Sequence, residues 1–237
     1  MYKGNYNILS FYCDCDDRLA LWAAARIMQE GAEEDTVRAG IGFEGLMAQG
    51  KAWVICRMHY EIHERPHCGE NVMLTTWSRG TNGLFALRDS RIEGSDGRTL
   101  ITSTTHWVII DYNTRHACRI NTILDNFDKH DMQATSIEKL DKMHPPLFDE
   151  SNIVFSLTTR RAMIDHTMHV NNSEYLRWIT DVINADGIVD YKAIDVDFVA
   201  ETKCNEKVDI YKIQDGSTIW FQILNSRGVA IRAKITL

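Results

Sequence analysis

The chain has 237 residues, of which 44% are hydrophobic and 25% are charged. This composition is typical of a soluble globular protein and excludes a disordered or membrane-spanning chain. The formal net charge of −7 argues against general affinity for nucleic acid. We therefore expect neither a nucleic-acid partner nor a membrane partner, and the length suits one large domain or two smaller ones.

The start of the chain and its cysteines favour a cytoplasmic protein. The opening stretch MYKGNYNILSFY lacks the long apolar run of a secretory signal. Six cysteines are scattered along the chain without a C-x-x-C pair. That pattern favours reduced thiols over a disulfide or zinc framework, so we expect no metal site.

The first half of the chain is predicted to contain one strand, one helix and then several strands. We expect a strand over Tyr6–Tyr12, a polar turn, and a helix from about Arg18. From Ala52 apolar and polar residues alternate, which predicts a long strand with one apolar face. Gly94–Gly97 suits a hairpin turn, and consecutive long strands indicate an antiparallel sheet. The further strands are expected at Asn71–Arg79, Leu84–Ile92 and Thr99–Asp111.

Residues Tyr112–Glu150 show weak periodicity, many charges and a pair of prolines. We interpret this stretch as a connector that crosses the surface, with a short helix near Ile137–Met143. A connector of this length suggests a junction between two units.

After the connector the same plan repeats. A strand at Ile153–Leu157 precedes a polar turn and an amphipathic helix. Asn171 is the expected N-cap, and Glu174 is placed to complete a capping box. The apolar stripe of the helix consists of Tyr175, Leu176, Ile179, Val182 and Ile183. Four strands should follow, at Tyr191–Thr202, Glu206–Gln214, Thr218–Ser226 and Val229–Leu237.

The two halves can be aligned on each other. Residues 14–18 correspond to residues 165–169, and residues 68–72 correspond to residues 204–208. An amphipathic helix that buries its stripe against a curved antiparallel sheet gives a hotdog unit. The repeat therefore predicts an α+β fold, a double hotdog. The expected divisions are an N-terminal hotdog at 1–125, a connector at 126–150 and a C-terminal hotdog at 151–237.

A motif in the second half agrees with this fold. DHTMHVNNSEYLRW, residues 165–178, resembles the D-x-N-x-H-V-N-N-x-x-Y-x-x-W signature of the acyl-acyl carrier protein thioesterases of plants and bacteria. Residues 52–92, with TTWSRG and FALRD, and residues 103–120, STTHWVIIDYNTRHACRI, are similar to first-half segments of that family. The resemblance covers nearly the whole chain and is weakest in the connector. It implies a double hotdog thioesterase without a metal or redox cofactor.

The resemblance also implies which residues carry the chemistry. Glu201 stands at the place of the family's catalytic carboxylate and would be the general base that positions water near the thioester carbon. Asp165 would be a second carboxylate that orients the turn or the base. His169 would orient water or donate to the carbonyl oxygen. Thr167 stands where the family has a catalytic asparagine, so either water is held differently or activity is reduced.

Each of these residues also suits a structural role. Helix N-terminal amides near Asn171 and Asn172 would add positive potential at an oxyanion, but both residues also suit a simple cap. His169 could hold the turn by hydrogen bonds alone. Glu201 could form a solvated pair with Lys203. The sequence alone does not decide between the two roles.

The first half lacks the same set of residues. Arg18 stands in place of His169, and Arg65 stands in place of Glu201. We therefore expect a non-catalytic half, and the resemblance implies that it helps to form the acyl-chain pocket. Thr202 occupies a position where some plant members have cysteine, which excludes a cysteine nucleophile at that point.

The resemblance implies an enzyme of fatty acid biosynthesis that hydrolyses fatty acyl-acyl carrier protein to free fatty acid and carrier. The partner would be acyl carrier protein, which would bind through positive side chains. An acyl-CoA thioesterase of the same fold and a non-hydrolysing acyl-binding protein stay open, as do chain-length preference and homodimer formation. The candidate carrier-binding residues are Arg160, Arg161, Arg177 and Lys203.

Overall fold

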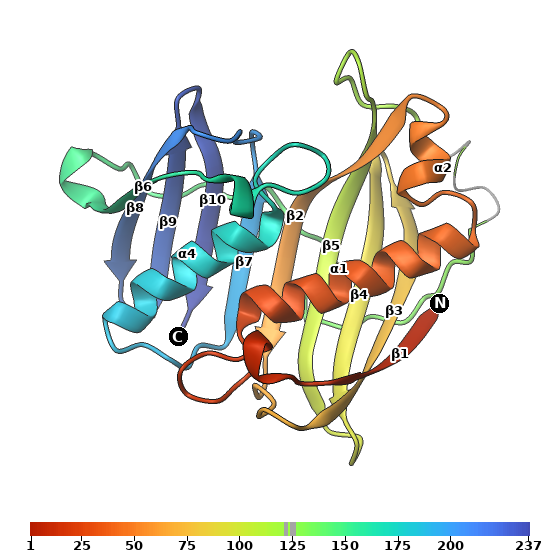
Figure 1. Cartoon of the computed structure of the whole chain (residues 1–237), viewed down its shortest axis with the longest axis horizontal. Coiled ribbons are helices and arrows are strands. Elements are labelled where there is room, and N and C mark those ends of the chain that lie inside the picture. Colours follow the sequence, from red (N-terminus) through yellow and green to blue (C-terminus); the bar gives the residue numbers. More distant parts are fainter. Residues whose placement is uncertain (121–122, 124–126) are drawn as a thin grey trace. The chain divides into compact units, whose positions relative to one another are not determined.

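A computed structural model describes residues 1–120, 123 and 127–237 of the chain. The chain divides into two compact units, residues 1–140 (unit 1) and residues 141–237 (unit 2). Each unit combines one long helix with antiparallel strands, which is the α+β plan that the sequence predicts (Figure 1). The predicted division between residues 125 and 126 lies outside the described residues.

Unit 1 packs helix α1 (Leu21–Arg38) on a sheet with the strand order β1-β3-β4-β5-β2. Gly31 lets the helix pack closely on β3, because a Cβ atom added there would lie 2.4 Å from the Leu74 side chain. A second helix, α2, covers Phe43–Met47. The strands are β1 (Tyr2–Asn7), β2 (Lys51–Ile62), β3 (Asn71–Asn82), β4 (Phe85–Gly94) and β5 (Thr99–Asp111).

Unit 2 packs helix α4 (Asn172–Ala185) on a sheet with the strand order β7-β10-β9-β8-β6 (Figure 1). The predicted stripe is buried at Leu176, Ile179 and Ile183, so the helix turns its apolar face inward. A short 3-10 helix covers Arg161–Met163. The strands are β6 (Ile153–Thr158), β7 (Ala193–Phe198), β8 (Lys207–Asp215), β9 (Thr218–Asn225) and β10 (Gly228–Thr236).

The internal repeat extends to individual backbone hydrogen bonds. The turn before each long helix contains one non-glycine residue with positive φ, Asp17 (62°) in unit 1 and Met168 (69°) in unit 2. The two turns therefore have one backbone conformation with different side chains. The matched bonds are Asp14 N to Arg18 O and Asp165 N to His169 O (both 2.9 Å), and Leu19 N to Pro66 O and Val170 N to Thr202 O (both 2.8 Å).

Two predicted boundaries in the first half are wrong. The predicted strand Tyr6–Tyr12 is shifted, since β1 ends at Asn7 and Ser10–Tyr12 form a 3-10 turn. The reason is local, because the amide of Tyr12 bonds back to the carbonyl three residues earlier (2.9 Å). The first helix begins at Leu21 and not near Arg18, because Arg18 belongs to the turn.

The predicted short helix at Ile137–Met143 is also wrong, since this segment contains no helix. Side chains of the unit 1 sheet bind its backbone groups instead. The Arg57 guanidinium donates to the carbonyl of Leu140 (2.7 Å), and the Glu61 carboxylate accepts from the amide of Ser136 (2.8 Å). Backbone groups bound in this way are not available to one another for helical hydrogen bonds.

Candidate active site

The loop after β7 and the turn before α4 bring Glu201 and His169 together. Oε2 of Glu201 lies 2.8 Å from Nε2 of His169. The His169 side chain is 12% exposed and that of Glu201 is 37% exposed, so the carboxylate remains accessible from outside. A carboxylate bonded to an imidazole and open on one side can accept a proton from bound water.

The sequence predicted that Glu201 lies on a strand, and this prediction is wrong. Strand β7 ends at Phe198, and the predicted strand Tyr191–Thr202 is therefore too long. Beyond Phe198 the amides of Val199 and Ala200 both bond to one carbonyl of β10, so regular pairing stops. Glu201 is placed by the loop that follows.

Asp165 and Thr167 form a second pair within the turn. Oδ1 of Asp165 accepts from the amide of Thr167 (2.9 Å) and from its hydroxyl (2.5 Å). The amide of Asp165 donates to the carbonyl of His169 (2.9 Å), so the same turn also fixes the backbone of the histidine. The arrangement matches an Asx turn, in which a carboxylate replaces a backbone acceptor.

Asn171 caps α4, as predicted, since its side chain accepts from the amide of Ser173 (3.0 Å). The predicted capping box with Glu174 does not form on the amide of Asn171, which donates to the carbonyl of Met163 (2.9 Å). Asn172 is the first residue of the helix, and among the described residues its amide has no hydrogen-bond partner. This amide lies at the positive end of the helix dipole.

Three further residues hold the loop that carries Glu201. Nδ2 of Asn225 donates to the carbonyl of Glu201 (3.1 Å) and to the hydroxyl of Thr202 (3.0 Å), and the Arg227 guanidinium donates to the same carbonyl. Tyr175 hydrogen-bonds to Thr202, and burial raises the pKa of Tyr175 to about 12, so the phenol stays neutral. Sequence reasoning missed Asn225 and Arg227, because they lie on the distant β9–β10 hairpin.

The equivalent position in unit 1 holds a different set of side chains. Nη1 of Arg65 lies 2.9 Å from Oδ2 of Asp14, and Nη2 bonds to Oδ2 of Asp16. The Arg65 side chain is only 6% exposed. A guanidinium clamped between two carboxylates can neither accept a proton nor attack a carbonyl.

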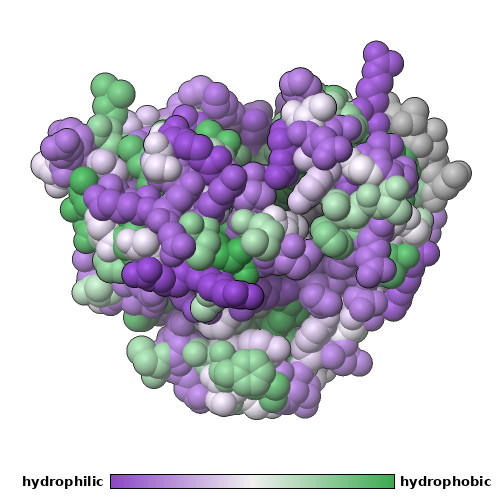
Figure 2. All heavy atoms as spheres, turned by 45° about the horizontal axis from the view of Figure 1, so that its top comes forward, coloured by the Kyte–Doolittle hydropathy of each residue, from purple (hydrophilic) through white to green (hydrophobic). Residues whose placement is uncertain are grey.

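The described surface is mostly hydrophilic, with hydrophobic residues in small separate patches on the face drawn in Figure 2. Among large apolar side chains near the site, Met168 is 72% exposed and Val199 is 48% exposed. Within the described residues, no cluster of three or more histidine, cysteine, aspartate or glutamate side chains could hold a metal ion. No described helix is long and apolar enough to span a bilayer.

Comparisons with protein families match both halves of the chain. The model of the acyl-ACP thioesterase N-terminal domain matches residues 1–127, and that of the C-terminal domain matches residues 148–237. Oleoyl-acyl carrier protein thioesterase 2 of Arabidopsis thaliana is 24% identical over 229 residues, which cover 88% of this chain and 61% of the relative. The chain thus spans less than two thirds of the length of that relative.

Solved structures match over nearly the full length. An acyl-ACP thioesterase from Bacteroides thetaiotaomicron has a TM-score of 0.87 at 21% identity, and it covers 99% of this chain and 96% of its own. The 12:0-ACP thioesterase from Umbellularia californica has a TM-score of 0.82 at 19% identity, with the same coverage. These likenesses confirm the predicted double hotdog fold.

Proposed function

Since the chain belongs to the acyl-ACP thioesterase family, we propose that it hydrolyses fatty acyl-acyl carrier protein to free fatty acid and carrier in fatty acid biosynthesis. The observation that carries the proposal is the 2.8 Å contact between the half-exposed Glu201 and His169. The six cysteines are free, which supports a reducing, cytoplasmic setting.

Glu201 acts as the general base in this proposal. Its carboxylate takes a proton from a water molecule while the water oxygen bonds to the thioester carbon. His169 donates to Oε2 and so stabilises the ionised carboxylate. The tetrahedral intermediate then breaks its C–S bond, and the proton passes from Glu201 to the sulfur. Because a thiol has an unperturbed pKa of about 8.5, its departure needs little acid assistance.

The helix α4 stabilises the negative charge on the carbonyl oxygen in this proposal. The amide of Asn172 lies at the N-terminus of a 14-residue helix and is the amide that would donate to the oxyanion. Asn171 contributes to the oxyanion site indirectly, because its side chain caps α4 and holds the first turn of the helix in place. Mutational data on other enzymes put the loss of one such donor at about 100-fold or more in rate.

Asp165 is proposed to hold the turn, and Thr167 is proposed to take the place of the family's asparagine at the water. The hydroxyl of Thr167 is bound to Asp165, and a hydroxyl has a single proton to donate. Water at this position would therefore have to donate to Thr167 and not accept from it. The observation favours a slower enzyme, or a protein that binds an acyl chain without hydrolysing it.

Thiol release tests these proposals directly. Fatty acyl thioesters of acyl carrier protein and of coenzyme A, over a range of chain lengths, are incubated with the full chain. We expect turnover with a higher kcat/KM on the carrier, and the length profile identifies the acyl group. A higher kcat/KM on coenzyme A would instead identify an acyl-CoA thioesterase. Retention of a fatty acid without thiol release from any substrate would refute the hydrolase and favour an acyl-binding protein.

A further inference from the structure

Three exposed cations of unit 2 lie on two segments that meet at the loop of Glu201. Arg160 and Arg161 immediately follow the loop end of β6, and Lys203 lies two residues beyond Glu201. All three side chains are exposed. Within the part of the chain that the structure describes, none of them has an ion-pair partner.

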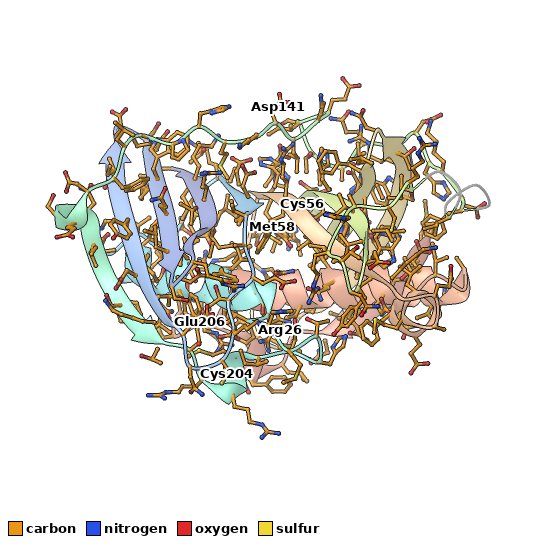
Figure 3. All side chains as sticks on the ribbon, turned by 90° about the horizontal axis from the view of Figure 1, so that it is seen from above. Arg26, Cys56, Met58, Asp141, Cys204 and Glu206 are labelled. Atoms are coloured by element: carbon orange, nitrogen blue, oxygen red, sulfur yellow. The ribbon has the colours of Figure 1, made fainter. Side chains whose placement is uncertain are left out.

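Hydrogen bonds hold the two cation-bearing segments against each other. The hydroxyl of Thr159 donates to the carbonyl of Lys203 (2.6 Å), and the amide of Asn205 donates to the carbonyl of Thr159 (3.0 Å). The buried Thr159 directly precedes Arg160. Figure 3 shows Cys204, the neighbour of Lys203, at an outer edge of unit 2 from which nitrogen-tipped side chains extend. The three cations therefore share one edge, beside the loop of Glu201.

Other cations of this region are already paired. Arg227 lies 3.8 Å from Glu206, Lys207 lies 2.9 Å from Asp209, and the fourth carrier-binding candidate, Arg177, lies 3.7 Å from Glu174. A single solvated surface cation needs no explanation. Here three exposed cations lie on two hydrogen-bonded segments beside the Glu201 carboxylate, in a chain of net charge −7. Together they make a local positive potential that suits an anionic group.

We infer that Arg160, Arg161 and Lys203 bind the phosphate of a substrate's phosphopantetheine arm. The inference rests on the proposed function, because that function places a pantetheine thioester at Glu201. Arginine offers a planar fork of donors that matches phosphate oxygens, and lysine adds a mobile point charge. Carrier protein and coenzyme A share this phosphate, so the site recognises chemistry common to both.

Paired small substrates test the inference with the full chain. Acyl thioesters of pantetheine and of 4′-phosphopantetheine differ only in the phosphate. We expect wild type to show about tenfold higher kcat/KM on the phosphorylated substrate, as for hydrogen bonds between charged groups. In Arg160→Ala/Arg161→Ala/Lys203→Ala this preference should vanish through KM, while kcat on the pantetheine thioester stays unchanged. Equal kcat/KM on both substrates in wild type would overturn the inference, as would an equal loss on both in the variant.

Lys142→Ala is the matched control, because it removes an exposed cation from the same unit. Its neighbour Asp141 lies on the opposite side of the view from Cys204 (Figure 3). The control should keep the full preference for the phosphorylated substrate. If it loses the preference as the triple variant does, net charge and not a site is responsible.

Direct binding separates this inference from the proposed hydrolysis. Calorimetry compares the affinity of wild type for 4′-phosphopantetheine and for pantetheine, neither of which can be hydrolysed as a thioester. Tighter binding of the phosphorylated compound, lost in the triple variant, supports the site even if no thioester is turned over. Equal affinities refute it even if hydrolysis is rapid. The kcat/KM of the triple variant is then measured on acyl-carrier and on acyl-CoA thioesters. The substrate whose kcat/KM falls is the one whose phosphate depends on the three cations.

Discussion

In unit 1 the loop after β2 places Arg65 against Asp14 and Asp16, whereas in unit 2 the loop after β7 places Glu201 against His169. The surrounding backbone is the same in both, down to the hydrogen bonds of the turn. The difference lies in accessibility as well as in charge. The Arg65 side chain is 6% exposed, and the Glu201 side chain is 37% exposed.

The same turn conformation carries an ion-pair cluster in unit 1 and an accessible carboxylate–imidazole pair in unit 2. In unit 1 the Arg65 guanidinium binds both carboxylates of the turn, so these side chains close the site. In unit 2 the carboxylate keeps one side open, and its partner is a side chain that can change its protonation state. The repeated backbone therefore supplies a scaffold, and its side chains decide whether an ion pair closes it or a carboxylate stays accessible.

Glu201→Gln should have the largest effect on activity, because an amide cannot accept the proton of water. General base catalysis contributes about 100-fold to 10,000-fold, so kcat in thiol-release assays should fall by at least about 100-fold. The fold should be retained, since glutamine keeps the shape of the side chain.

Asp215→Asn is the matched control, because it neutralises an exposed carboxylate at the end of β8 in the same unit. Surface substitutions usually change free energies by about 0.5 kcal/mol or less, so kcat should stay within roughly a factor of two. Equal losses in both variants would mean that the negative charge of the unit, and not a base at Glu201, supports turnover.

Arg65→Met should show that the equivalent residue in unit 1 serves stability. Removing one partner of a buried ion pair costs about 3–5 kcal/mol, and the partial exposure of Asp14 (26%) and Asp16 (29%) reduces this to about 2–3 kcal/mol. In a chain of this size Tm in thermal unfolding should fall by about 5–10 °C.

Arg98→Met provides the comparison, because Arg98 also bridges two carboxylates, those of Asp96 and Glu64, but is 51% exposed. Exposed pairs contribute little because water and salt screen them, so Tm should fall much less than in Arg65→Met. A larger loss in Arg98→Met than in Arg65→Met would reject the view that burial makes the unit 1 cluster structural.

Asn225→Ala should reveal a positioning residue in unit 2. Its two donated hydrogen bonds, to the carbonyl of Glu201 and to Thr202, hold the loop that presents the carboxylate. Losing these two bonds, worth about 1 kcal/mol each, should lower kcat by about 30-fold with little change in KM. Gln222→Ala on the same strand should leave both constants unchanged. A loss of Tm with kcat unchanged would assign Asn225 to stability alone.

The sequence predicted best what is local along the chain. Asp165, Thr167 and Asn171 lie within one turn, and their side-chain contacts reach at most two residues, so pattern and capping rules were sufficient to place them. Glu201 was proposed from the position of a family carboxylate, although strand β7 ends three residues earlier. Asn225 was missed because only sheet pairing brings its hairpin to that loop.

The secondary structure of the connector was mispredicted for the same reason, because contacts with distant residues determine it. Charges and weak periodicity indicated a surface crossing, but the predicted helix at Ile137–Met143 ignored the sheet beneath it. Arg57 and Glu61 bind its backbone from a strand some eighty residues earlier in the chain. Hydrogen bonds between distant segments override local helix propensity, and a single sequence contains no pattern that shows them.

Thr167→Asn should produce the smallest effect and test the one position where the turn of unit 2 departs from the family motif. The threonine uses its hydroxyl proton on Asp165 (2.5 Å). An asparagine amide could donate one proton to Asp165 and leave the other for water, so kcat should rise by roughly fivefold, the value of about one hydrogen bond. Thr167→Val, which keeps the shape but removes the hydroxyl, should lower kcat by a similar factor. If neither substitution changes kcat, this position does not act on the water, and Glu201 with His169 must hold it without help from the turn.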